Sequence, residues 1–386
     1  MIARSETSPR AELLAIPMTP SSRLEVNSGV SRLSGKIWAT LWRSGSARKR
    51  TVVVFAHPSS NFMGHYALEY MSTLGVDAVG MTTRYLGNDS ALIMENCLLD
   101  IGSTVGYLKS IGYHNIVLVG NSGGGGLVAL YQAQATNPTI QTTPAGDPID
   151  IAAHGLPKAT SIVMAMAHPG RSVVYTESMD PAINNENDPF DRNPDIDIFN
   201  ISRQPPYTAE FIREYRAGQV DRNRRISQWC RDQLDELAKR RTEDSTAPDD
   251  LPFVVHGTAA DLRFLDRSID PSDRNIGTIW GPPSVANFIP ASLGHHTSLR
   301  SWLSQWSLDD SRANAYRQLP LVTCPVMVAH GTADNAAFPS HAKKMFEAIP
   351  DGLGTFVEFE GADHYFTGRP DLLQAMATAI VDWIVE

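Results

Sequence analysis

The sequence predicts an α/β fold in which helices flank a central, mostly parallel sheet, with a largely helical cap inserted into it. Three continuous apolar runs, at 51–56, 115–119 and 162–167, alternate with helical patterns, and such runs are typical of strands covered on both faces. The same strand pattern returns at 325–329 and 355–359, after a long stretch of different character. Strands that alternate with helices in this way indicate a parallel sheet.

Composition places the chain among ordinary globular proteins. Of its 386 residues, 42% are hydrophobic and 19% are charged, unlike the composition of disordered or fibrous chains. The net charge is −9 and no Lys- or Arg-rich run could follow a phosphate backbone, so we expect no nucleic acid partner. The three widely spaced cysteines, Cys97, Cys230 and Cys324, predict neither a disulfide framework nor a thiolate zinc site.

Residues 1–20 contain three prolines and little periodicity, and we expect them to form a loosely held N-terminal arm. Their apolar stretch is too short for a secretory signal, and no segment has the roughly 20 apolar residues that a membrane span needs. The expected location is therefore cytoplasmic, with no membrane partner.

Residues 21–172 are expected to form the first part of the core. Short mixed segments over 24–42 suggest antiparallel strands ahead of the first buried strand. Apolar positions spaced along 91–112 predict a helix. The buried strand 115–119 leads into a glycine-rich turn, and a further helix is expected from about Leu127.

Residues 173–306 break this pattern and are expected to form the cap. A long amphipathic helix is predicted over 208–241, preceded by a segment rich in Asp, Asn and Pro and followed by one without a sheet pattern. Residues 307–386 then complete the core with the two returning strands and a closing helix over 371–385.

The candidate nucleophile is Ser122, in the sequence Gly-Asn-Ser-Gly-Gly at 120–124, which fits G-x-S-x-G between a buried strand and a helix. A serine hydroxyl is a weak nucleophile unless it is held exposed beside a base, and a sharp strand-to-helix turn achieves this. Glycines two residues to either side relieve the crowding of such a turn. The alternatives are an ordinary glycine-rich turn and a phosphate-binding loop, but the latter needs a Lys-Ser/Thr pair where Leu127 and Val128 stand.

A serine nucleophile needs a base to take its proton and a carboxylate to orient that base. Asp334 and His364 each follow directly on one of the two returning strands, so both are expected at the carboxyl edge of the sheet, where open α/β sheets bind ligands. The chain order Ser122, Asp334, His364 predicts a catalytic triad. A helix N-cap for Asp334 and a solvated loop position for His364 are the alternatives, and Asp261, in a similar segment, is a weaker candidate for the acid.

Attack on a carbonyl creates an oxyanion that must meet preset N–H donors. The backbone N–H of Gly123 is one expected donor, and Ser59 is the best candidate for the second, because Pro58 beside it has no N–H. His57 is expected either to steady that loop or to contact the substrate. His168 ends another core strand and is a further candidate substrate contact.

Two adjacent histidines, His295 and His296, come nearest to a metal-binding motif. Adjacent side chains point apart, and no third ligand has an obvious spacing from them. We therefore expect no metal and no cofactor.

The serine turn, the aspartate loop and the histidine loop together resemble the nucleophile elbow, acid loop and histidine loop of the α/β-hydrolase superfamily. The resemblance implies an eight-stranded, mostly parallel sheet and a two-step hydrolysis through an acyl-enzyme. The pair His57-Pro58 departs from this pattern, because many relatives carry His-Gly there.

These features predict a serine hydrolase that cleaves a carboxylic ester or lactone of a small to medium organic molecule. The alternatives are a C–C bond hydrolase for a diketone-type substrate, since some capped relatives combine this triad with a G-N-S motif, and an amide hydrolase. A non-catalytic binding protein of the same fold would be expected to lack a member of the triad. The sequence predicts neither the identity of the small-molecule substrate nor the oligomeric state.

Overall fold

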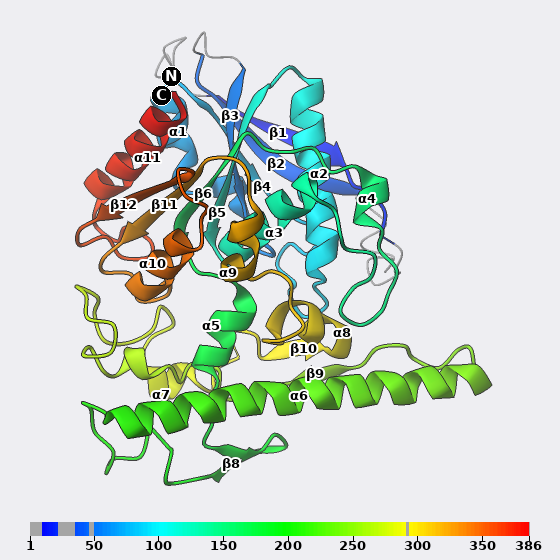
Figure 1. The fold of residues 1–386 in the computed structure, drawn as a ribbon, viewed down its shortest axis with the longest axis vertical. Helices are drawn as coiled ribbons and strands as arrows, with labels where there is room; N and C mark the ends of the chain where they lie inside the picture. The colour runs from blue at the N-terminus through cyan, green and yellow to red at the C-terminus, as the bar shows by residue number, and fades with distance from the viewer. Residues whose placement is uncertain (1–9, 22–34, 46–49, 291–292, 386) are drawn as a thin grey trace, which may run out of the picture.

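The computed structural model describes residues 10–21, 35–45, 50–290 and 293–385. Within these ranges eight strands form one sheet, in the order β1-β2-β4-β3-β5-β6-β11-β12 (Figure 1). β1 pairs antiparallel with β2, and β2 pairs antiparallel with β4. The remaining strands of this sheet, β4, β3, β5, β6, β11 and β12, are parallel to one another, which confirms the predicted α/β architecture. The strands are β1 (Arg10–Pro17), β2 (Lys36–Arg43), β3 (Thr51–Ala56), β4 (Asp77–Met81), β5 (Asn115–Ser122), β6 (Ser161–Ala167), β11 (Val326–Gly331) and β12 (Gly354–Phe359).

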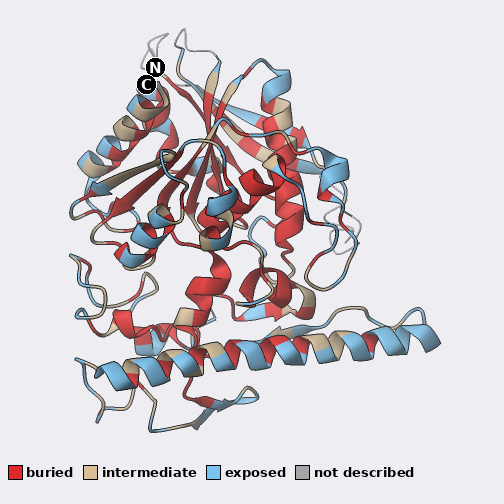
Figure 2. Ribbon diagram, in the orientation of Figure 1, coloured by how far each residue is buried: buried red, intermediate tan, exposed pale blue. Residues whose placement is uncertain are grey.

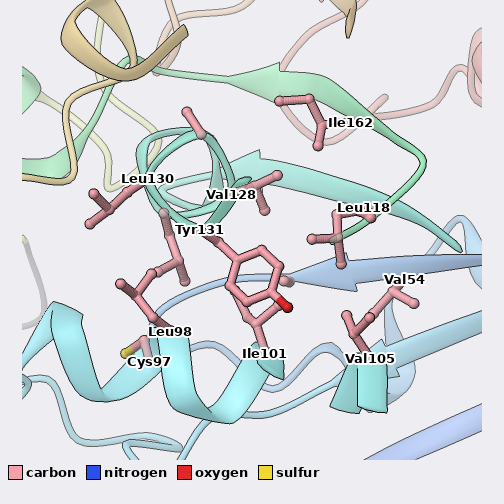
Figure 3. Packing of buried hydrophobic residues seen from close by; sticks show 14 of the residues in the cluster. Val54, Cys97, Leu98, Ile101, Val105, Leu118, Val128, Leu130, Tyr131 and Ile162 are labelled. Atoms are coloured by element: carbon pink, nitrogen blue, oxygen red, sulfur yellow. The ribbon is translucent and has the colours of Figure 1, made fainter. Parts of the chain in front are cut away.

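Helices cover both faces of the sheet because both faces of its central strands are apolar. In β3, Val52 and Val54 belong to one hydrophobic cluster, and Val53 and Phe55 belong to the other. α2 and α3 pack on the first cluster, as Figure 3 shows around Val54, while α1 and α11 pack on the second. Burial on both faces explains why these strands are apolar throughout. The helices around the sheet are α1 (Leu68–Thr73), α2 (Met94–Ser110), α3 (Gly124–Thr136), α4 (Ile151–His154), α9 (Ala315–Gln318), α10 (Pro339–Glu347) and α11 (Pro370–Val385).

The segment between β6 and β11, residues 168–325, adds no strand to this sheet in its described part. Figure 1 shows most of it gathered at one end of the sheet, with the long helix α6 along the outer side, and Figure 2 shows buried and exposed positions alternating along α6. The division into a core of 21–172 and 307–386 and a cap of 173–306 stays a prediction. The elements of the segment before α9 are α5 (Arg171–Ser178), β7 (Ile183–Asn185), β8 (Asp188–Arg192), α6 (Ala209–Glu243), β9 (Pro252–Val254), α7 (Pro283–Ala286), β10 (His296–Ser298) and α8 (Leu299–Ser301).

The prediction of a loosely held arm over residues 1–20 is wrong for 10–17. These residues form the edge strand β1, in which Leu14 and Ile16 are buried and the side chain between them is exposed. The alternation spans so few residues between prolines that it leaves only a weak periodic signal. The remainder of the arm at 1–9 lies outside the described residues.

Strand β4 was not predicted, because Asp77 and Gly80 interrupt its apolar pattern. Gly80 is needed there, since a methyl group in its place would collide with the carbonyl oxygen of Phe62. Antiparallel strands were expected over 24–42; β2 agrees with this expectation, and residues 22–34 lie outside the described part of the chain.

The described ranges contain neither a membrane-spanning helix nor a metal-binding group of side chains. None of the helices there is both long enough and apolar enough to cross a bilayer. Nor do three or more His, Cys, Asp or Glu side chains come together, in those ranges, in a group that could hold a metal ion.

Candidate active site

Ser122 lies on a strained turn between β5 and α3. Its φ is 53°, a left-handed conformation that side-chain-bearing residues seldom adopt. A methyl group on Gly120 would lie 2.5 Å from the carbonyl oxygen of Gly124, and one on Gly124 would lie 2.1 Å from that of Ala56. Both glycines are therefore required for the chain to pass this closely, and the turn leaves the serine side chain half-buried at the carboxyl edge of the sheet.

The structure brings His364 and Asp334 to this serine. His364 Nε2 lies 3.1 Å from Ser122 Oγ, and His364 Nδ1 lies 2.8 Å from Asp334 Oδ2. Asp334 Oδ1 accepts the backbone N–H groups of Ala336 and Ala337, each at 2.8 Å. The carboxylate is fully buried and all of these contacts hold it in one orientation, so a single line of hydrogen bonds joins the hydroxyl, imidazole and carboxylate.

The electrostatics of this line make the imidazole more basic than a free histidine. Burial raises the pKa of the Asp334 carboxyl, but the attraction and hydrogen bond of His364 outweigh burial and hold that pKa below its usual range. Burial lowers the pKa of His364, and Asp334 overcomes this and raises it above the usual value. Because Asp334 accepts the Nδ1–H, the Nε2 lone pair is left to face the serine hydroxyl.

The placement of Ser122, Asp334 and His364 on the sheet decides the fold. Ser122 stands on a strained strand-to-helix turn at the end of β5, Asp334 follows β11 and His364 follows β12, in a mostly parallel sheet of eight described strands. The chain has the α/β-hydrolase fold.

The chain is similar to known proteins in structure rather than in sequence. No family model matches it, and no curated protein matches it. Among solved structures, it is similar to the monoacylglycerol lipase of Paleococcus ferrophilus, with 17% identity, a TM-score of 0.45 and coverage of 90% of this chain and 98% of that one. It is also similar to the esterase domain of a Rhodothermus marinus protein, with 10% identity, a TM-score of 0.47 and 97% of both chains covered. Est1E from Butyrivibrio proteoclasticus has 13% identity and a TM-score of 0.46, over 91% of this chain and 96% of that one. At such distances the α/β-hydrolase assignment rests on the sheet and the serine turn.

The rival acid, Asp261, is held elsewhere in the α/β-hydrolase fold. Its carboxylate pairs with Arg216 at 2.9 Å and with Arg263 at 2.6 Å. Those two cations hold its pKa at about 2, against the effect of burial. The structure therefore gives Asp261 a place in a buried charge network, and it is Asp334 that contacts His364.

The loop after β3 carries the expected oxyanion donor and a histidine. His57 Nδ1 accepts the backbone N–H of Ser59 at 3.2 Å and that of Ser60 at 2.9 Å, so its proton resides on Nε2. Burial, followed by the charge of Arg171, lowers the pKa of His57 and keeps the ring neutral. These bonds are what a loop-steadying histidine would make, and they engage the Ser59 N–H in the structure as it stands.

His168 lies on the other side of the serine turn. Its backbone N–H donates to the carbonyl oxygen of Ser122 at 3.2 Å, and its Nδ1 accepts the N–H of Gly170 at 3.2 Å. Burial lowers the pKa of His168 to about 3, so the ring is a neutral group.

A cavity of about 400 Å³ lies above the serine, between the sheet and the segment 168–325. It has room for a small organic molecule. Sequence reasoning did not single out one of its charged groups, Arg171, although the short loop between β6 and α5 places it at the same sheet edge as Ser122. From the loops of the sheet the lining includes His57, Ser59, Ser122, Gly123 and Tyr365, and from the segment it includes His168, Arg171, Val174, Phe264, Trp280 and Leu293.

Proposed function

We propose that the protein is a serine hydrolase that cleaves a carboxylic ester or lactone of a small to medium organic molecule through an acyl-enzyme on Ser122. The observation that carries the proposal is the line from Ser122 Oγ to His364 Nε2 at 3.1 Å and from His364 Nδ1 to Asp334 at 2.8 Å. Those distances are within the reach of direct proton transfer, and the basicity of the imidazole is raised by a buried carboxylate.

In the first half of the reaction, Ser122 Oγ bonds to the carbonyl carbon while its proton passes to His364 Nε2. The backbone N–H of Gly123, at the amino end of α3, is the first proposed donor to the oxyanion, and the helix dipole favours negative charge there. Ser59 is the proposed second donor, since its bond to His57 is the longer of the two on that ring. Collapse of the tetrahedral intermediate breaks the ester C–O bond, and the leaving oxygen takes the proton from His364.

In the second half, water attacks the acyl carbon and gives a proton to His364. The second intermediate expels Ser122 Oγ, which recovers that proton, and the carboxylic acid product leaves. Asp334 stabilises the imidazolium that forms in both halves without taking a proton itself.

A fluorophosphonate probe, read by intact-protein mass spectrometry, tests the nucleophile. We expect covalent labelling of the wild type and none of Ser122→Ala. The matched control is Ser340→Ala, which removes an exposed serine at the start of α10 and should label like the wild type. A wild type that stays unlabelled would contradict the proposal.

The bond that is cleaved is tested with a substrate panel. Short p-nitrophenyl esters report the esterase activity, p-nitroanilides the amidase activity, and a ring-fission dienoate the C–C bond hydrolase activity. Turnover of the dienoate or the anilides without turnover of any ester would replace the ester assignment by the corresponding alternative.

A further inference from the structure

Arg171 is a buried cation beside the proposed nucleophile. It is the first residue of α5, it lines the 400 Å³ cavity, and only 4% of it is exposed to solvent. A methyl group on Gly123, the residue after the nucleophile, would lie 3.5 Å from Arg171 Nε. The guanidinium therefore stands next to the position where a substrate carbonyl would meet the serine.

Most of the partners of Arg171 are uncharged. Its Nη2 donates to Ser59 Oγ at 2.6 Å, and its Nη1 donates to Gln305 Oε1 at 2.6 Å. The guanidinium also lies 5.0 Å from the centre of the Trp306 ring. Among the described residues, Asp89 supplies the one ionic contact, at 3.3 Å, and Nε has no acceptor.

Three other arginines with buried side chains, Arg84, Arg222 and Arg263, are compensated far more fully. Arg84 forms several hydrogen bonds with Asp100, the shortest at 2.7 Å, and Arg222 pairs with Glu186 at 2.6 Å. Arg263 contacts two carboxylates, at 2.5 and 2.6 Å. In each of these three the carboxylates outweigh burial and raise the pKa of the guanidinium. In Arg171 burial prevails over Asp89 and the pKa is lowered, so the charge is short of a counter-ion.

In the part of the chain that the structure describes, no carboxylate other than Asp89 pairs with this guanidinium. His57 and His168 are both held neutral by burial, and Asp334 is engaged by His364. A buried arginine with an unused N–H on a substrate-sized cavity matches the planar, acceptor-rich geometry of a carboxylate.

We propose that Arg171 forms an anion subsite and that the substrate carries a carboxylate close to the bond that Ser122 attacks. The inference rests on the proposed function for its reaction but specifies the substrate class, an ester or related acyl compound with a free acid group. In binding, the carboxylate accepts the Nε–H of Arg171 and takes over part of the role of Asp89.

The test compares acidic and neutral substrates of equal length. The substrates are the monoethyl esters of malonic, succinic and glutaric acids and the ethyl esters of the unbranched acids of the same chain length, with hydrolysis followed by proton release. Because a charge-assisted hydrogen bond is at stake, we expect the wild type to favour one acidic ester over its neutral counterpart by about 10- to 100-fold in kcat/KM. Equal or higher kcat/KM for the neutral esters throughout would overturn the proposal.

Variants of Arg171 test whether this residue causes the preference. In Arg171→Met we expect the ratio of the two kcat/KM values to fall to about one, and in Arg171→Lys to an intermediate value, since the lysine keeps the charge without the planar fork. The matched control is Arg224→Met, which removes an exposed arginine paired with Asp309 on α6 and should keep the wild-type ratio. A ratio in Arg171→Met equal to that of the wild type would refute the assignment.

A second variant, expected to raise the preference for the acidic ester rather than to abolish it, keeps the proposal testable if Arg171→Met does not fold. Asp89→Asn retains Arg171 and removes its competing carboxylate, and Asp89 is exposed enough, at 36%, to be replaced without burying a new polar group. We expect the preference for the acidic ester to rise severalfold. A preference that falls would contradict the proposal.

Binding without turnover separates this inference from the proposed reaction. In Ser122→Ala, we expect glutarate or succinate to bind more tightly than the corresponding diamide by calorimetry, and this difference to disappear when Arg171→Met is added. Such binding by a protein that the fluorophosphonate does not label would retain the anion subsite and refute the hydrolase. Labelling without any carboxylate preference in binding would retain the hydrolase and refute the subsite.

Discussion

Asp334→Asn tests the proposed triad most sharply because it changes the proton arrangement and leaves the shape of the site intact. In this variant the side-chain carbonyl oxygen would stay on the two backbone N–H groups that Asp334 Oδ1 accepts, from Ala336 and Ala337 at 2.8 Å each. The side-chain NH₂ would then face His364 Nδ1, where Oδ2 lies at 2.8 Å in the native protein. Two N–H donors cannot share that contact, so the imidazole must move its proton to Nε2 and lose its ability to accept the serine proton.

The expected loss follows from that tautomer. Wrong-tautomer variants of serine hydrolases lose on the order of 10⁴-fold in kcat, which corresponds to about 5.5 kcal/mol of activation free energy. We expect this loss with the best ester of the panel, together with a cooperative thermal transition that shows an intact fold. Retention of more than about a tenth of the wild-type kcat, in a folded variant, would refute the role of Asp334 as the orienting acid.

The same Asp-to-Asn substitution at two other positions provides a control, at Asp309, and a test of the alternative acid, Asp261. Asp309→Asn breaks an exposed pair with Arg224 and should leave kcat unchanged. Asp261→Asn removes the buried carboxylate that pairs with Arg216 and leaves Arg263 with Glu177 alone, so we expect a loss of about 3–5 kcal/mol in unfolding free energy with kcat within a few fold of the wild type. The reverse pattern, in which Asp261→Asn abolishes turnover and Asp334→Asn does not, would identify Asp261 as the acid.

Three further predictions concern pH and stability. Because Asp334 raises the pKa of His364 and only the neutral imidazole accepts a proton, kcat/KM should rise with pH through an apparent pKa above about 6.5; a midpoint below about pH 6 would contradict this. Gly124→Ala would put a methyl group 2.1 Å from a carbonyl oxygen, so we expect about 3 kcal/mol or more of destabilisation in denaturant unfolding, whereas Gly64→Ala, with nothing within 4 Å, should have little effect. Arg222→Ala leaves Glu186 without its partner and removes a buried side chain, and should cost about 3–5 kcal/mol of unfolding free energy, whereas exposed Arg224→Ala should leave the melting temperature nearly unchanged; equal melting temperatures of the two variants would refute that reasoning.

The strands that carry the site were predictable because their signals are local. β3, β5, β6 and β11 each contain a short apolar run, and β12 contains a mostly apolar one. The residues that follow a parallel strand lie at the carboxyl edge of the sheet, so the position of these residues follows from the strand alone. The signal weakened where a strand broke that pattern, as in β4 with Asp77 and Gly80, or where it was too short, as in β1.

Helix α6 illustrates a limit of the same reasoning. Its position was predicted to within a few residues, but nothing in the sequence of the helix distinguishes Arg222 from Arg224. In the structure Arg222 is fully buried against Glu186 and backbone carbonyls, while Arg224 is exposed. Which of the two turns inward depends on the partner that packs there, and that partner is not encoded in the helix itself.

The amino-acid sequence was enough to predict the parallel sheet, the serine turn and the candidacy of Ser122, Asp334 and His364, because each follows from residues adjacent along the chain. The folded structure was needed to show that Asp334 rather than Asp261 meets the histidine, how His57 is bonded, and that Arg171 faces the cavity short of a counter-ion. These outcomes depend on distances and burial between segments tens to hundreds of residues apart, and such contacts exist only once the chain has folded.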